Sequence, residues 1–277
     1  MKTATGSPGF VDCHVHIRDN AGLDQLARAG IIAAREAGLR ENAAQVGSLC
    51  PTQAGPVVVI RACWALYKKG GYGSQFGVAV DSLEEIRTEI LKLKQAGAGI
   101  IKVMASGIVS LRRPGSITPG GFTGDELKYI VQESARAGLG VMAHANGEEA
   151  ITASVRAGVR SLEHGFFMTA RALDVIAKYG TFWTPTVGAL ARAADKGKVS
   201  AEVQAYVGSL IRSHQEMILR AHALGVTLAI GTDYVLPDAR YKDAYEAELR
   251  YFGQAGLSRD AVLVIACDNG ARLLGLK

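Results

Sequence analysis

The sequence predicts an α/β fold in which eight parallel strands alternate with helices and close into a barrel, a (β/α)8 or TIM barrel. Short β-branched or apolar runs alternate with longer amphipathic stretches as far as the C-terminus. The chain has 277 residues, close to the roughly 250 of a typical barrel of this kind. Hydrophobic residues make up 48% of it, enough to bury one large core. We therefore expect a single domain over residues 1–277.

Eight short apolar runs are the predicted strands, and each begins a strand–helix unit. They cover residues 9–16, 30–35, 57–63, 99–104, 140–144, 161–164, 181–186 and 226–231. Since all strands of such a barrel run in one direction, their C-terminal ends meet at one face.

Amphipathic stretches between and after these runs are the predicted helices. They cover residues 23–29, 41–46, 82–96, 123–137, 148–157, 170–179, 201–224, 243–254 and 258–274. Ser82 and Thr123 are each followed three positions later by glutamate, the pattern of a capping box. Glycines at 97, 138, 158, 180 and 225 each follow a helix, where a left-handed residue commonly ends it.

Ionisable side chains gather at the C-terminal ends of the predicted strands, where such barrels place their active sites. They are His14, His16, Lys102, His144, His164 and Asp233. His14 and His16 lie two positions apart in a strand and so share a face, which favours a metal site. A pair of solvated or core histidines is the alternative. We assign no site to His214 and His222, which lie in a predicted helix.

Lys102 lies among Ile100, Ile101, Val103 and Met104 in the predicted fourth strand. A buried ammonium is costly, so burial lowers the pKa of the amine and makes it nucleophilic. The alternative is a lysine that extends to the barrel rim.

Six segments, taken in order, resemble the amidohydrolase superfamily, in particular its imidazolonepropionase-like and Xaa-Pro dipeptidase-like branch. They are PGFVDCHVH (8–16), IKVMASG (101–107), AHANG (143–147), SLEHG (161–165), GTD (231–233) and NGARLLGL (269–276). The resemblance implies a Lys102 carbamate, formed with carbon dioxide, that bridges two divalent metal ions. It implies that His14, His16 and Asp233 hold the first ion and that His144 and His164 hold the second.

The resemblance also implies a metal-dependent hydrolase in which a hydroxide between the two ions attacks a carbonyl group. Asp233 is then the catalytic residue that accepts the hydroxide's proton and passes it to the leaving group. Neutral imidazoles and a carboxylate suit zinc, with manganese, nickel or iron as alternatives.

The sequence departs from these relatives in two respects. We expect the barrel alone, without the small β-sandwich domain that most relatives carry, and hence a homo-oligomer that covers exposed apolar surface. Tyr72 stands in KKGGYG (68–73) where dipeptidase-like relatives have a histidine. With Lys68, Arg112 and Arg113 it is a candidate substrate contact, although an aromatic that packs the loop is the alternative for Tyr72 and solvated loop charges are the alternative for the others.

We expect a carbon–nitrogen bond hydrolase that acts on a small, sometimes anionic amide, cyclic amide or N-acyl compound rather than on ordinary peptide bonds. Ester, lactone or Xaa-Pro dipeptide hydrolysis is the alternative activity. A catalytically silent barrel that binds a partner is the non-enzyme alternative.

Composition argues against other classes. The formal net charge is +5, but the basic residues are dispersed and are not interleaved with aromatics, so we expect no nucleic-acid partner. No stretch approaches about 18 uninterrupted apolar residues and the first residues form no apolar signal core, which predicts a cytoplasmic protein with no membrane partner. The four cysteines contain no C-x-x-C pair, and we expect reduced thiols.

Overall fold

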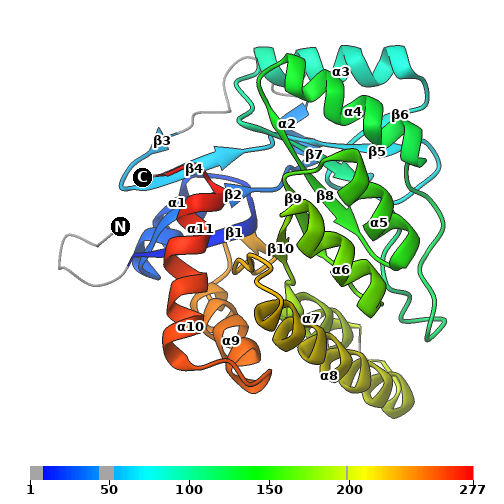
Figure 1. Cartoon of the computed structure of the whole chain (residues 1–277). Coiled ribbons are helices and arrows are strands. Elements are labelled where there is room, and N and C mark those ends of the chain that lie inside the picture. The colour runs from blue at the N-terminus through cyan, green and yellow to red at the C-terminus, as the bar shows by residue number, and fades with distance from the viewer. Residues whose placement is uncertain (1–8, 44–52, 198, 277) are drawn as a thin grey trace.

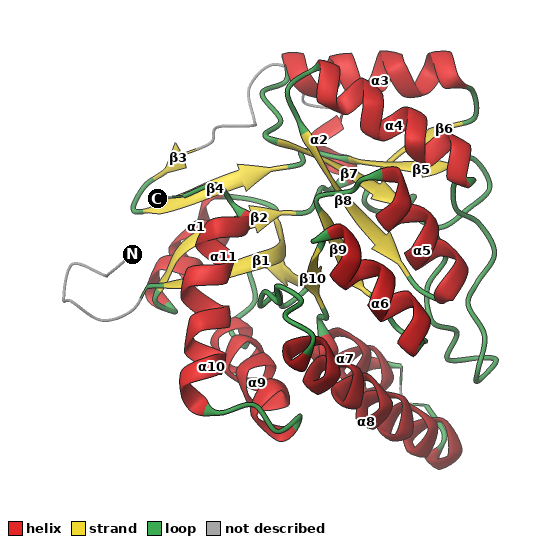
Figure 2. Ribbon diagram, viewed as in Figure 1, coloured by secondary structure: helices red, strands yellow, loops and turns green. Residues whose placement is uncertain are grey.

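Strands form the centre of the molecule and helices surround them (Figure 1, Figure 2). The computed structural model describes residues 9–43, 53–197 and 199–276. The strands are β1 (Phe10–Ile17), β2 (Ile31–Glu36), β3 (Gln53–Ala54), β4 (Val57–Arg61), β5 (Ala65–Lys68), β6 (Gly77–Val80), β7 (Ile100–Met104), β8 (Gly140–Ala145), β9 (Ser161–His164), β10 (Phe182–Thr184) and β11 (Tyr234–Leu236).

Most of the helices follow a strand and cover the outside of the barrel (Figure 1). They are α1 (Asn20–Arg28), α2 (Arg40–Ala43), α3 (Leu83–Gln95), α4 (Gly124–Arg136), α5 (Glu148–Ala157), α6 (Ala170–Tyr179), α7 (Val187–Lys196), α8 (Ala201–Ala223), α9 (Tyr241–Gln254), α10 (Arg259–Val264) and α11 (Gly270–Leu273). A π-helical segment, Ile265–Asn269, joins α10 to α11.

Two parallel sheets together make the ring of strands. Their strand orders are β11-β1-β2-β4-β3 and β10-β9-β8-β7-β5-β6, and only β3 runs antiparallel to its neighbour. On one side of the ring, Gly99 N donates to Arg61 O at 2.9 Å. On the other, residues around Leu228 bridge Trp183 of β10, and Cys13 N of β1 donates to Ile230 O at 2.8 Å. The strands therefore run in the order that the predicted barrel requires.

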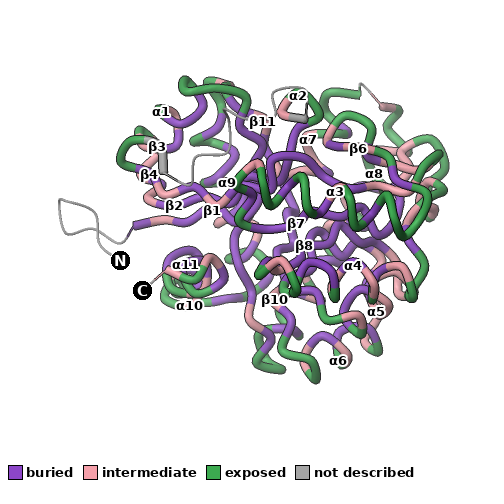
Figure 3. The backbone as a smooth tube through the Cα atoms, turned by 90° about the horizontal axis from the view of Figure 1, so that it is seen from above, coloured by how far each residue is buried: buried purple, intermediate pink, exposed green. Residues whose placement is uncertain are grey.

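The strands and the inner faces of the helices are buried, while the outer faces of the helices are exposed (Figure 3). Side chains such as Leu26, Ile90, Ile130 and Ile176 pack from helices onto the strands, and each is 0–1% exposed. This packing explains the amphipathic pattern from which the helices were predicted.

Several local predictions are confirmed. Thr123 forms both halves of the predicted capping box with Glu126, and Ser82 accepts the amide hydrogen of Glu85. The five glycines predicted to end helices all have positive φ, between 66° and 95°. Seven predicted strands correspond to β1, β2, β4, β7, β8, β9 and β10.

The predicted eighth strand, residues 226–231, lies in its expected place but is wrong as a regular strand, because only Leu228 forms a bridge. Directly after this segment, the amide of Thr232 donates to the Asp12 side chain at 3.1 Å instead of to the backbone of a neighbouring strand. Regular pairing with β1 begins only at Tyr234, in β11.

Other differences concern elements that the sequence analysis did not predict. Strands β5 and β6 extend the third strand unit, and α7 begins immediately after β10. The predicted helix 258–274 is interrupted by the π-helical segment. The predicted helix 41–46 is described only as far as residue 43, and the rest of it, like Cys50, lies outside the described residues.

Cysteine chemistry differs in part from the expectation. Cys13 and Cys267 are free and buried. Cys63 is disulfide-bonded, so the prediction of a reduced thiol is wrong for this residue.

No helix among the described residues is both long and apolar enough to span a membrane.

Glu248 of α9 is fully buried and fixes the start of α7. Its carboxylate accepts the amide hydrogens of Val187 at 2.7 Å and Gly188 at 2.8 Å, two groups that a helix start leaves without partners.

We predict that Glu248→Ala lowers the free energy of unfolding, measured in urea, by about 1–3 kcal/mol because buried amides lose their acceptor. Glu246→Ala, an exposed position on the same helix, is the control; an equal effect of the two changes would contradict the capping role.

Candidate metal centre

One cavity of about 520 Å³ lies at the C-terminal ends of the strands. Strand β1 contributes His14 and His16, β7 contributes Lys102, and β8 and β9 contribute His144 and His164. Asp233 reaches the cavity from the segment before β11. All six side chains that the sequence singled out as metal ligands therefore line the same space.

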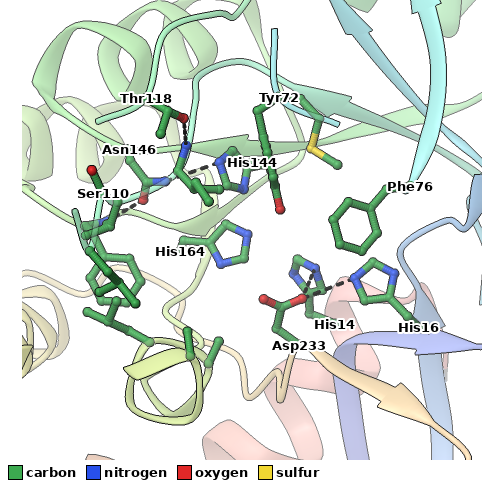
Figure 4. A pocket seen from close by; sticks show the side chains of 18 of the residues that line it. His14, His16, Tyr72, Phe76, Ser110, Thr118, His144, Asn146, His164 and Asp233 are labelled. Carbon is green, nitrogen blue, oxygen red and sulfur yellow. Dashed lines mark hydrogen bonds and ion pairs between the residues drawn. The ribbon is translucent and has the colours of Figure 1, made fainter. Parts of the chain in front are cut away.

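The four imidazole rings and the Asp233 carboxylate form a continuous cluster (Figure 4). Asp233 Oδ1 lies 3.1 Å from His16 Nε2 and 3.3 Å from His14 Nε2. His14, His164 and Asp233 each offer one ligand atom, and these atoms all lie within 4.8 Å of one another. The ring centroids of His144 and His164 are 4.5 Å apart, so the cluster continues to β8.

Each histidine uses one ring nitrogen for a hydrogen bond to the surrounding protein. His14 Nδ1 contacts Glu163 Oε2 at 2.9 Å, and His16 Nδ1 donates to Gly38 O at 2.7 Å. His144 Nε2 donates to Gly107 O at 2.9 Å, and His164 Nδ1 contacts Thr186 Oγ1 at 2.6 Å. The second nitrogen of each ring is then available as a ligand, which is how metal-binding histidines are usually held.

A buried ion pair orients His14. Glu163 Oε1 accepts hydrogen bonds from Arg35 at 2.7 Å and from Ser161 Oγ at 2.5 Å, while its other oxygen faces His14. Burial alone would raise the pKa of Glu163, but Arg35 and His14 lower it to about 2. The carboxylate is therefore ionised at neutral pH and accepts the Nδ1 hydrogen of His14.

Two glycines allow backbone carbonyls to reach the histidines. Gly38 has φ +96°, and a Cβ there would lie 2.9 Å from Ala65 N. A Cβ on Gly107 would lie 1.9 Å from Thr118 O. Only glycine fits either position, which places the two carbonyls against His16 and His144.

Lys102 is 1% exposed, and its Nζ has no hydrogen-bond partner among the described residues. Burial lowers the pKa of this amine from its usual 10.5 to about 8. A buried amine without a partner is costly. A group that reacts with or binds the amine would remove this cost.

Burial also keeps His14, His144 and His164 neutral. It lowers the pKa of His14 to about 4 and that of His144 to about 3, with Lys102 adding to both effects. Burial and the neighbouring His144 hold the pKa of His164 well below its usual value. Neutral imidazole is the form that binds metal ions.

Asp233 stays ionised for the opposite reason. Burial would raise the pKa of its carboxyl group, but His14, His16 and His164 hold it well below its usual value. Its backbone has φ +50°, and Thr186 (+50°) and His164 (+66°) also adopt left-handed conformations. Such strained residues persist where the surrounding structure holds them, often at functional sites.

The four predicted substrate contacts separate into two pairs. Tyr72 and Arg112 line the cavity, whereas Lys68 and Arg113 are not among its lining residues. Lys68 Nζ instead contacts Glu126 Oε1 at 2.8 Å and Asp81 O at 2.9 Å. These contacts tie β5 to the start of α4.

Several residues that hold the ligands were not predicted. They are Arg35, Gly38, Gly107, Glu163 and Thr186. One sequence pattern could have indicated Arg35: it forms a charged pair with Glu36 directly after the apolar run 31–34. Glu163 lies inside one of the motif segments, but its contact with His14 spans 149 positions.

The donor set fits a pair of divalent ions. Four imidazoles with fixed outer nitrogens and one ionised carboxylate are ligands that zinc and similar ions accept. The Lys102 amine, for which the described residues offer no partner, is chemically suited to add carbon dioxide as a carbamate, which would supply two further oxygens.

A parallel barrel with such a cluster at its strand ends is the architecture of a metal-dependent enzyme class, and comparison with known proteins names the family. The model of the amidohydrolase family matches residues 6–277, and the chain therefore belongs to this family. The predicted superfamily and barrel fold are confirmed.

Individual relatives are more distant. Ochratoxinase of Aspergillus niger is 33% identical over 168 residues, 60% of this chain and 35% of that sequence, so the match spans about a third of that relative's length. A solved prolidase complexed with N-methylphosphonate-L-proline is 26% identical, with TM-score 0.76, over 98% of this chain and 75% of that one. A Xaa-Pro dipeptidase with bound methionine shares the fold at TM-score 0.78 and 21% identity, over 98% and 76% of the two chains.

The cost of burying Lys102 gives a pH-dependent prediction for the metal-free protein. Between about pH 8 and 10.5 the folded protein binds fewer protons at Lys102 than the unfolded chain, so its free energy of unfolding rises with pH over that range. The gain is on the order of 3 kcal/mol and is lost as the pH falls through 8. We predict that Lys102→Met, which carries no charge, lacks this rise.

Urea unfolding from pH 7 to 10.5, in carbonate-free buffer with a chelator, measures the effect. The variant is expected to be more stable than the wild type at pH 7 and to lose this advantage by pH 10.5. Parallel pH curves for the two proteins would show that the buried amine does not titrate as we expect.

Proposed function

We propose that this protein is a hydrolase that uses two divalent metal ions to cleave a carbon–nitrogen bond in a small amide, cyclic amide or N-acyl compound. The observation that carries the proposal is the cavity lined by all six expected ligands, in which each histidine has one ring nitrogen bonded outward. Family membership supports the same conclusion.

In this proposal His14, His16 and Asp233 would hold one ion, and His144 and His164 would hold the other. Lys102 would lose a proton and add carbon dioxide, and the resulting carbamate would supply further oxygen ligands. Zinc suits these ligands best, and manganese, nickel or iron are alternatives. When bound, the ions lower the pKa of a water molecule and polarise the substrate carbonyl.

Asp233 moves the proton. Its carboxylate is ionised at neutral pH, so Oδ1 or Oδ2 can accept a proton from the attacking water. The same carboxyl group then donates that proton to the leaving nitrogen. Its side chain is 24% exposed, which leaves it accessible to a substrate in the cavity.

Tyr72 orients the substrate carbonyl. Its hydroxyl group points toward the histidine cluster (Figure 4). Burial raises the pKa of Tyr72 and Asp233 raises it further, so the phenol keeps its hydrogen and can donate one hydrogen bond. The ring also packs 5.2 Å from His144 and 6.0 Å from Phe76, between centroids, which gives it a structural role as well.

Arg112 provides for an anionic substrate. Its side chain is exposed and lines the cavity. Among the described residues, it has no ion-pair or hydrogen-bond partner. A guanidinium group there can bind a carboxylate with two parallel hydrogen bonds.

An amide-type substrate is favoured over an ester or lactone by the similarity to ochratoxinase and to a prolidase. Xaa-Pro dipeptides remain an alternative within the same chemistry. Assays of the metal-loaded protein against paired amide and lactone libraries, with Xaa-Pro dipeptides included, separate these activities.

Metal content distinguishes an enzyme from a silent barrel. We predict about two transition-metal ions per chain after growth with added zinc or manganese, because the mechanism needs both positions filled. Elemental analysis of the purified protein measures this ratio. Fewer than about one ion per chain would favour the silent barrel.

Asp233→Asn tests the proton transfer. We predict that turnover falls by about 100-fold or more while much of the metal stays bound, because the amide cannot accept the proton. Lys102→Ala is expected to lose both metal and turnover, since the carbamate is gone. Asp243→Asn, an exposed position on α9, is the control. Full activity of either Asp233→Asn or Lys102→Ala would contradict the assigned roles.

A further inference from the structure

Much of the cavity lining away from the histidines is apolar, although Ser110, Arg112 and Thr118 also line it. Its lining side chains come from the segment between β7 and α4, from the residues after β9 and from α7. We call the following set the apolar wall: Val109, Leu111, Phe166, Ala189, Leu190 and Ala193. Ser110 and Thr118, beside this wall, lie across the cavity from His14, His16 and Asp233 (Figure 4).

The apolar wall is built on an ordered hairpin. Thr118 N donates to Ile108 O at 2.8 Å, and Ser110 N donates to Ser116 O at 2.9 Å. Two hydroxyl groups beside the wall brace the hairpin, because Thr118 Oγ1 accepts from Ile108 N and Ser110 Oγ accepts from Arg113 N, each at 3.0 Å.

Packing from behind holds the apolar wall in place. Val109, Phe166 and Leu190 are 4–8% exposed and belong to one hydrophobic cluster. The same cluster contains Ala194, Val207 and Leu210 from α7 and α8. The wall thus has a fixed shape before any substrate arrives, which reduces the entropy cost of binding.

Two alanines leave room in front of the wall. Ala189 and Ala193 lie four positions apart on α7 and so share one face of the helix. Ala189 is half-buried and Ala193 is exposed. A longer side chain at either position would occupy cavity volume without changing a metal ligand.

We propose that the apolar wall is the subsite for a bulky apolar group of the substrate, aromatic or branched aliphatic, and that Ala189 and Ala193 determine the size of group accepted. This inference rests on the proposed amide hydrolysis. Burial of such a group against the wall removes apolar surface from water and holds the scissile bond next to the ligands.

Two series of N-acyl amino acids test the proposal. One series varies the acyl side of the scissile bond and the other varies the amino-acid side, because the proposal holds for a bulky group on either side. In the first series the acyl group grows from acetyl through hexanoyl and benzoyl to 2-naphthoyl on glycine. In the second, acetyl is kept and glycine is replaced by leucine and phenylalanine. In at least one series we expect kcat/KM to rise by about 10-fold or more with size.

Ala189→Leu is expected to remove this gain, so that kcat/KM falls by about 10-fold or more for the bulky substrates relative to acetylglycine, because it fills the subsite. Ala191→Leu makes the same change on the same helix at a position that does not line the cavity. It is expected to behave as the wild type, and thermal melting checks that both variants are folded. A wild type that is active but indifferent to size, or an Ala189→Leu that loses small and large substrates equally, would overturn the inference.

Calorimetric titration with 2-naphthoate and acetate separates this inference from the proposed function. We expect 2-naphthoate to bind about 10-fold more tightly than acetate, and Ala189→Leu but not Ala191→Leu to remove the difference. If the metal-loaded protein cleaves no amide, the proposed function fails, and this titration still decides the subsite. Equal affinities in the wild type and Ala189→Leu would overturn it.

Discussion

The burial of the Lys102 amine, which has no hydrogen-bond partner in the described part of the chain, is the constraint on which the site depends. A protein ordinarily avoids such a group or pairs it, because desolvation of the charged form is costly. Here the amine lies among His14, His144 and His164, which are themselves held neutral by burial. Under the proposed function, a carbamate on the amine and cations at the histidine nitrogens would remove this cost.

The barrel supplies the preorganisation that such a site needs. The strand ends bring the candidate ligands to one mouth, and hydrogen bonds from one nitrogen of each imidazole ring fix its orientation. The Arg35–Glu163 ion pair is the strongest example, because a buried pair is worthwhile only with good geometry and additional hydrogen bonds. Here Ser161 and His14 supply those bonds. The apolar wall on the opposite side of the cavity is held by packing from behind.

Local patterns in the sequence were sufficient to predict the barrel and the six candidate ligands that line its cavity. The shared face of His14 and His16 follows from strand alternation, and Asp233 could be located although the strand before it is irregular. Contacts between distant segments were not readable in this way. The pairing of Lys68 with Glu126 spans 58 positions and removes Lys68 from the cavity lining. Helix α7 was not predicted. It begins directly after Thr186, which has a left-handed backbone (φ +50°), a conformation that the residue type does not indicate.

Anomalous diffraction from crystals of the metal-loaded protein tests the central claim most directly. The account predicts two metal peaks about 3.5–4 Å apart in the cavity, with electron density that continues from Lys102 Nζ to a group between them. Absence of metal at these residues, or a Lys102 side chain that ends at its amine beside a single ion, would contradict it.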